Sequence, residues 1–113
     1  MNNTQPLLSQ LVKTELSSLG VSKKYNGFKS LADLIVINFT SKPQKDFSTL
    51  FSEVAKLNNA TIDAIEHNVK HLLLNSWNRS SVFKKLLSSH ISVNINTHSL
   101  LEAIIKYIEN SIF

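Results

Sequence analysis

The stretch of sequence that decides the fold is residues 58–77, which read NNATIDAIEHNVKHLLLNSW. It opens on two turn-forming asparagines, and Thr61 can then accept a hydrogen bond from a free backbone N–H group at a helix start. At about 100° per residue, one side of such a helix carries Ile62, Ile65, Val69, Leu72, Leu73 and Ser76. The opposite side carries Asp63, Glu66, His67, Lys70, His71 and Leu74. The pattern predicts a long amphipathic helix over about residues 61–77 with a crowded polar face.

A shorter helix is expected just before this one, from Phe47 to Leu57. Its apolar residues are spaced for burial on one side: Leu50, Phe51, Val54 and Leu57. Two helices joined by a few polar residues, with long polar side chains on the second, have the outline of a helix-turn-helix. A plain helical hairpin inside a bundle has the same outline, so the motif alone leaves both interpretations open.

The rest of the chain also reads as helices joined by short connections, because it contains only 2 Gly and 2 Pro. The further helices are expected from near Pro6 to Gly20, from Phe28 to about Thr40, from Ser81 to Leu87 and from Thr97 to Ile112. The second of these is apolar almost all round and should be central. The expected inward residues are Leu8, Leu11, Val12, Leu16 and Leu19 in the first helix and Val82, Phe83, Leu86 and Leu87 in the fifth. Residues 88–96 read as an irregular connection.

These elements predict an all-α fold of about six helices, without a wing, in which residues 1–113 form a single domain. The chain has 12 Lys+Arg against 8 Asp+Glu, and its net charge of +4 is compatible with a polyanionic partner. It has no cysteine, no signal-peptide pattern and no apolar run long enough to span a bilayer, so a cytoplasmic protein with no membrane partner is expected.

Catalysis, cofactors and metals are not expected. His67 and His71 lie four residues apart, with Asp63 one turn earlier, and such a triplet can bind zinc or nickel. A helix surface lacks a fourth ligand, however, so a solvated or DNA-facing polar face is the simpler interpretation. The serines have no Gly-x-Ser-x-Gly turn and no paired base, which argues against an enzyme.

An ordered set of residues along the chain resembles a known family. The set consists of Gly20, Gly27, Phe28, Leu31, Ile35, Ala55, Lys56, Asn59, Thr61, Glu66, His71, Trp77, Arg79, Thr97 and Ser99. It is similar to the C-terminal DNA-binding effector domain of the stage 0 sporulation protein A response regulators, over roughly Leu11 to Ile108. Family members usually follow a phosphorylatable receiver domain. If Met1 is the native start, no aspartyl-phosphate switch acts within this chain.

The resemblance implies a six-helix domain whose fourth helix enters the major groove of duplex DNA. It also implies regulation of sporulation genes together with the RNA polymerase sigma subunit. The residues expected to contact DNA are Asn59, Thr61, Asp63, Glu66, His67, Lys70, His71 and Arg79. Lys70 and His67 stand where the family usually has arginine, and Ala64 replaces another basic residue. Arginine reads guanine through two hydrogen bonds, which lysine and histidine do not reproduce.

Two functions therefore stay open. The first is a small DNA-binding transcription regulator related to sporulation control. The second is a protein-interaction module that keeps the fold, binds DNA weakly and pairs with itself or with a full-length sporulation regulator. The predicted partner surface is on the last helix and consists of Leu100, Ile104 and Tyr107. Leu100 would be an exposed apolar residue unless the 88–96 connection covers it within the same chain.

Overall fold

The computed structural model describes residues 4–91 and 94–113, and within these ranges it contains helices and no strand. The α-helices are α1 (Thr4–Ser18), α2 (Gly27–Thr40), α3 (Phe47–Leu57), α4 (Ile62–Arg79), α5 (Ser81–Leu87) and α6 (Thr97–Ile112). A short 3₁₀ turn, η1 (Ser88–His90), follows α5. The predicted all-α class with about six helices is confirmed.

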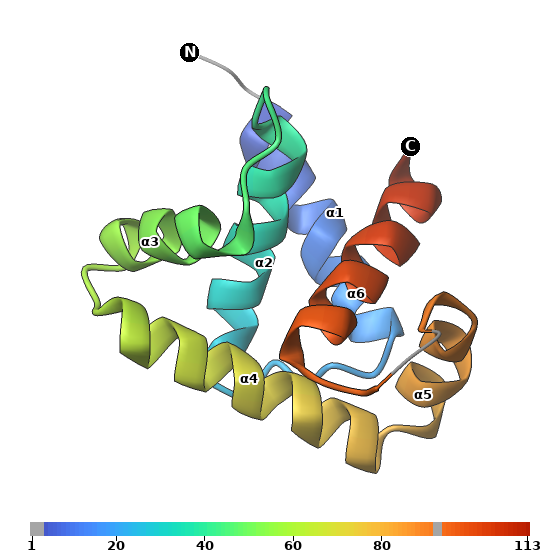
Figure 1. The fold of residues 1–113 in the computed structure, drawn as a ribbon. Coiled ribbons are helices and arrows are strands. Elements are labelled where there is room, and N and C mark those ends of the chain that lie inside the picture. Colours follow the sequence, from blue (N-terminus) through green and yellow to red (C-terminus); the bar gives the residue numbers. More distant parts are fainter. Residues whose placement is uncertain (1–3, 92–93) are drawn as a thin grey trace.

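Helix α2 occupies the centre of the molecule, as its apolar sequence predicts. It packs against α1, α3 and α4 (Figure 1). The last helix, α6, packs against α1, α4 and α5. Buried residues from all six α-helices join one apolar cluster. The start of α1 and the end of α6 lie at the end of the molecule opposite α4, which runs along the lower edge in Figure 1. One side of α4 is therefore left without a neighbouring helix.

Local side-chain caps start α3, α5 and α6 where the sequence predicts these helices to begin. Asp46 accepts a hydrogen bond from the Thr49 backbone N–H at 2.8 Å, and this cap starts α3. Ser80 accepts from the Phe83 N–H at 3.1 Å and starts α5. Helix α6 begins with a reciprocal capping box between Asn96 and Ser99. Each cap satisfies backbone donors that would otherwise lack a partner within the helix.

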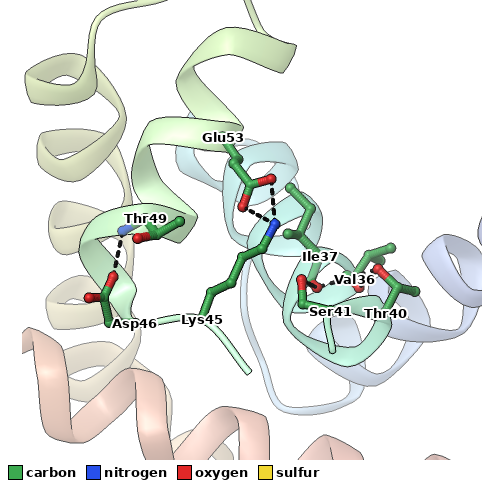
Figure 2. Close-up of polar contacts among 8 residues, drawn as sticks. All are labelled: Val36, Ile37, Thr40, Ser41, Lys45, Asp46, Thr49 and Glu53. Atoms are coloured by element: carbon green, nitrogen blue, oxygen red, sulfur yellow. Dashed lines mark hydrogen bonds and ion pairs between the residues drawn. The ribbon is translucent and has the colours of Figure 1, made fainter. Parts of the chain in front are cut away.

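The polar contacts of the α2–α3 connection are shown in Figure 2. Lys45 donates to both carboxylate oxygens of Glu53 at 2.8 Å, which ties the connection to the middle of α3 (Figure 2). At the end of α2, the Thr40 hydroxyl donates to the Val36 carbonyl at 3.0 Å and the Ser41 hydroxyl to the Ile37 carbonyl at 2.6 Å. These bonds satisfy carbonyl groups of the last turn of α2.

The Asp46 cap makes the stability of α3 sensitive to acid. The backbone N–H of Thr49, followed by its side chain, holds the pKa of the Asp46 carboxyl below its ordinary value of 3.8. A carboxyl whose pKa is lower in the folded state stabilises the fold above its unfolded pKa, and this contribution disappears as the pH falls through the folded pKa. We therefore expect Asp46→Asn to flatten the loss of stability below about pH 4, measured by urea unfolding at several pH values. An unchanged pH profile would contradict the cap.

Several helix boundaries differ from the sequence prediction by one or two residues. Helix α1 runs from Thr4 to Ser18 rather than from near Pro6 to Gly20, and α2 begins at Gly27 rather than Phe28. Helix α4 begins at Ile62, one residue later than expected, and continues through Arg79, two residues past the expected end at Trp77. The connection over residues 88–96 contains the 3₁₀ turn and is otherwise irregular where it is described, whereas residues 92 and 93 lie outside the described part.

Five residues that were predicted to be inward are exposed, with 36–63% of their surface accessible: Leu11, Leu57, Ile62, Val82 and Leu86. Two of them, Leu57 and Ile62, are terminal residues of α3 and α4, where the helix extends beyond its packing partners. Leu11 lies about 100° around α1 from the buried Val12, at the edge of the apolar arc. The helical period locates the inward side of each helix correctly, but the neighbouring helices cover a narrower arc of its surface than the apolar pattern suggests.

Candidate nucleic-acid interface

The turn between α3 and α4 is fixed to α2 by one side chain, Asn58. Its amide oxygen accepts from Lys29 Nζ at 2.9 Å, and its amide nitrogen donates to Asp33 Oδ2 at 3.2 Å and to the Val54 carbonyl at 2.8 Å. Lys29 and Asp33 also form an ion pair at 2.9 Å. This network ties the C-terminal end of α3, directly before the turn, to α2. The sequence pattern does not identify Asn58 as part of it, because Lys29 and Asp33 are distant along the chain.

Asn59 and Thr61 are exposed and also have structural roles in this turn. Asn59 has a φ of 52°, the left-handed conformation that usually ends a helix. Its N–H donates to the Lys56 carbonyl at 3.3 Å and the next N–H, that of Ala60, donates to the Ala55 carbonyl at 2.9 Å. Thr61 Oγ1 accepts from the Ala64 N–H at 3.1 Å, so the predicted cap of α4 is confirmed.

Helix α4 buries the inner side predicted for it and exposes the polar side. The buried residues are Ile65, Val69, Leu72, Leu73 and Ser76, and the exposed polar residues are Asp63, Glu66, His67, Lys70 and His71. Because α4 lies at the edge of the molecule, no other helix covers this polar side in Figure 1. The rings of His67 and His71 are stacked, with centroids 6.0 Å apart and 21° between their planes.

Charge is unevenly distributed along the exposed side of α4. The acidic residues Asp63 and Glu66 lie in its first two turns, whereas the basic residues come later, with Lys70 at the middle of the helix and Arg79 at its end. An acidic residue in the first turn is stabilised by the helix dipole, but it repels a phosphate group. The second half is therefore the better place for a DNA backbone, and the first half is limited to contacts that tolerate negative charge.

Arg79 lies apart from the other predicted contacts. At about 100° per residue it is about 120° around the helix from His67 and about 180° from Lys70. It lines a concave site beside α4 together with Lys24 and Asn75. Arg79 is thus directed to the flank of the helix. The other predicted contacts are all exposed, in the turn or on the polar side of α4: Asn59, Thr61, Asp63, Glu66, His67, Lys70 and His71.

Two large side chains near the end of α4 belong to the packing of the molecule. Leu74 is half-buried against the apolar cluster although it lies on the polar side. Trp77 is half-buried and meets the ring of Phe83 edge-on, with centroids 6.5 Å apart, at the corner between α4 and α5. Lys84 Nζ lies 5.6 Å from the centroid of the Trp77 ring.

The expectation that Leu100 is an exposed apolar residue of a partner surface is wrong for this chain. Leu100 and Ile104 are both 0% exposed, because α6 packs against α1, α4 and α5 and against the 3₁₀ turn. Tyr107 is half-buried, with its ring edge-on to that of His90 at 6.5 Å. Side chains that are covered within one chain cannot also form the centre of an interface with another.

Within residues 4–91 and 94–113, the structure contains no group of three or more His, Asp or Glu side chains that could hold a metal ion. Nor is any helix in the described part both long and apolar enough to cross a bilayer.

Comparison with curated proteins and with solved structures gave no match. A comparison with protein families gave one whose description is Sporulation initiation factor Spo0A C terminal, and its model matches residues 12–112. The match covers the end of α1 and the whole of α2 to α6, and it therefore includes both α3 and the exposed helix α4. The chain therefore belongs to the Sporulation initiation factor Spo0A C terminal family, the DNA-binding effector domains that its sequence resembles.

Proposed function

We propose that this protein is a transcription regulator related to sporulation control, which inserts α4 into the major groove of duplex DNA as the second helix of a helix-turn-helix. The observation that carries the proposal is the exposed polar side of α4. It holds five charged or imidazole side chains at the edge of the molecule, and the Asn58 network ties the end of α3 directly before the turn to α2. Membership of the family supports the same function.

Base contacts are expected from the outer side of the first half of α4. In a helix-turn-helix, residues in the N-terminal part of the second helix reach the base edges. His67 and Lys70 lie close together there, and each can donate one hydrogen bond to the acceptors that purines present in the major groove. Asp63 and Glu66 can accept a hydrogen bond from the amino group of cytosine, and this limits the DNA sequences to which the helix can bind. As in the family, we expect the bound protein to contact the RNA polymerase sigma subunit.

The test is fluorescence anisotropy with a duplex selected from a random library, titrated over a salt series. We expect the affinity of the wild-type protein to fall as salt rises, because displaced counterions contribute much of the binding free energy. Lys70→Ala and His67→Ala should each weaken binding to the selected duplex by about 1–3 kcal/mol. Lys42→Ala is the matched control, since Lys42 belongs to the connection after α2, residues 41–46, which begins at the end of the molecule remote from α4 (Figure 1).

Two results would count against the proposal in different ways. If both α4 variants bind the selected duplex as the wild-type protein does, the base contacts are assigned to the wrong residues. If the wild-type protein binds no duplex at about 50 mM salt, the DNA-binding function itself fails.

The second candidate function is the interaction module. It is favoured by the acidic residues Asp63 and Glu66 in the part of α4 that would read bases, because they oppose a polyanion. The burial of Leu100 and Ile104 removes the partner surface that was predicted for it on α6. Pairing with a second copy or with a full-length regulator would therefore use the exposed polar side of α4, and sedimentation in the absence of DNA tests for it.

A further inference from the structure

The connection between α1 and α2, residues 19–26, is held against α4 at both of its ends. At one end, a Cβ added to Gly20 would lie 2.2 Å from Ser80 Oγ, and Ser80 Oγ donates to the Leu19 carbonyl at 3.4 Å. At the other end, a Cβ added to Gly27 would lie 2.4 Å from the Asn68 carbonyl oxygen. Residues 68 and 80 are separated by about 18 Å of helix. The connection therefore runs along the second half of α4 (Figure 1).

The two glycines are required for this placement. Gly20 has a φ of 91°, and its N–H and that of Val21 donate to the carbonyls of Ser17 and Leu16, both at 3.0 Å. This is the left-handed cap that ends α1 and turns the chain towards α4. Within the connection, Ser22 Oγ accepts from the Lys24 backbone N–H at 3.2 Å. The backbone that carries Lys24 is thus held in a defined turn beside the helix.

Between the two ends of the connection lies a concave site of about 290 Å³. Its polar lining comes from both sides: Ser22, Lys24 and Tyr25 from the connection, and Asn75, Arg79 and Ser80 from α4 and its cap. Lys24 and Arg79 are exposed cations, and the lining contains no carboxylate. Neither cation forms an ion pair with an acidic residue in the described part of the chain.

We propose that this site binds a phosphodiester group of the DNA backbone beside the major groove that α4 enters. The proposal deepens the proposed function and rests on it. Two cations without a carboxylate, together with hydroxyl and amide donors, match the charge and the several acceptor oxygens of a phosphate. Arg79 can present two parallel N–H groups to such an anion, and Lys24 adds a second positive charge.

The position of the site around α4 supports a backbone contact rather than a base contact. Arg79 is directed about 120° away from His67 around the helix axis. It therefore lies beside the surface that would face the bases and not on it. A helix in the major groove has a sugar–phosphate backbone along each flank. The negative end of the α4 dipole lies nearby and opposes an anion, so we expect binding to depend on both cations.

The test measures the salt dependence of duplex binding for wild-type protein, Lys24→Ala, Arg79→Ala and Arg79→Lys. Neutralising one phosphate contributes about 0.9 to the slope of log K against log salt. We expect Lys24→Ala and Arg79→Ala each to lower the slope by about 0.9 and to weaken selected and random duplexes by the same factor. Arg79→Lys should keep the slope because it keeps the charge. Lys42→Ala is again the control, and circular dichroism checks that each variant is folded.

The outcomes separate this proposal from the one it rests on. If the wild-type protein binds duplex and neither alanine variant lowers the slope, the phosphate site is wrong and the DNA-binding function stands. If the wild-type protein binds no duplex, both are wrong.

A free anion such as inorganic phosphate offers the same acceptor oxygens and charge to this site as a DNA phosphodiester does. Titration with inorganic phosphate, followed by NMR at the backbone amides of residues 22–25, distinguishes the two. Saturation below about 1 mM inorganic phosphate, which is tight binding for a single small anion, would overturn the assignment to DNA. Weak or absent binding of inorganic phosphate, together with the lowered slopes, supports it.

Discussion

Phe83→Ala is expected to lower the free energy of unfolding by about 3–5 kcal/mol, the usual cost of removing a fully buried aromatic side chain. Phe83 is 0% exposed and is among the largest fully buried side chains of the described residues. Its ring also meets Trp77 edge-on, and such aromatic pairs contribute about 0.5–1.5 kcal/mol beyond the area that they bury. The cavity left by alanine would lie between α5 and the last turns of α4.

Urea unfolding followed by circular dichroism measures this effect, with Val82→Ala as the matched control. Val82 is the preceding residue on the same short helix but is 46% exposed, so its truncation should change the stability by no more than about 0.5 kcal/mol. The amphipathic pattern of α5 assigns both residues to the core, and the comparison therefore tests the burial directly. Equal effects of the two substitutions would contradict the packing of α5.

Gly27→Ala is expected to destabilise the fold by about 2 kcal/mol, within the range known for overpacked sites. The added Cβ would lie 2.4 Å from the carbonyl oxygen and 2.8 Å from the carbonyl carbon of Asn68, and 3.2 Å from Leu72 Cβ. Two of these are backbone atoms, so a change of side-chain rotamer cannot relieve the clash. Helix α2 would have to move away from α4, which would weaken the packing of the central helix against the helix that carries the candidate DNA-binding surface.

Asn26→Ala is the control for this substitution. Asn26 is the adjacent residue, is exposed, and makes no side-chain hydrogen bond to the start of α2, so its loss should have little effect on stability. Thermal and urea unfolding of both variants provide the comparison. A Gly27→Ala protein as stable as the wild-type protein would mean that α2 and α4 do not approach each other as closely as the structure has them.

The candidate DNA-binding surface divides into a part that the sequence predicts and a part that it does not. The exposed side of α4 follows from the helical period, because residues that share one side of a helix are set by their spacing alone. The direction of Arg79 follows from the same geometry once α4 is known to continue through that residue. The neighbours of Arg79 do not follow, because Lys24 approaches it only through the docking of the α1–α2 connection on α4.

Sequence alone determined the helices and most of their limits in this protein. Caps and breakers such as Asp46, Thr61, Ser80 and Gly20 act on backbone groups within a few residues, so their effect can be read locally. The tertiary structure decided which apolar residues are covered, as the exposed Leu57 and the buried Leu100 show. Burial depends on where the neighbouring helices end and cross, and that is fixed by close contacts between distant residues, such as Gly27 with Asn68 and Asn58 with Asp33.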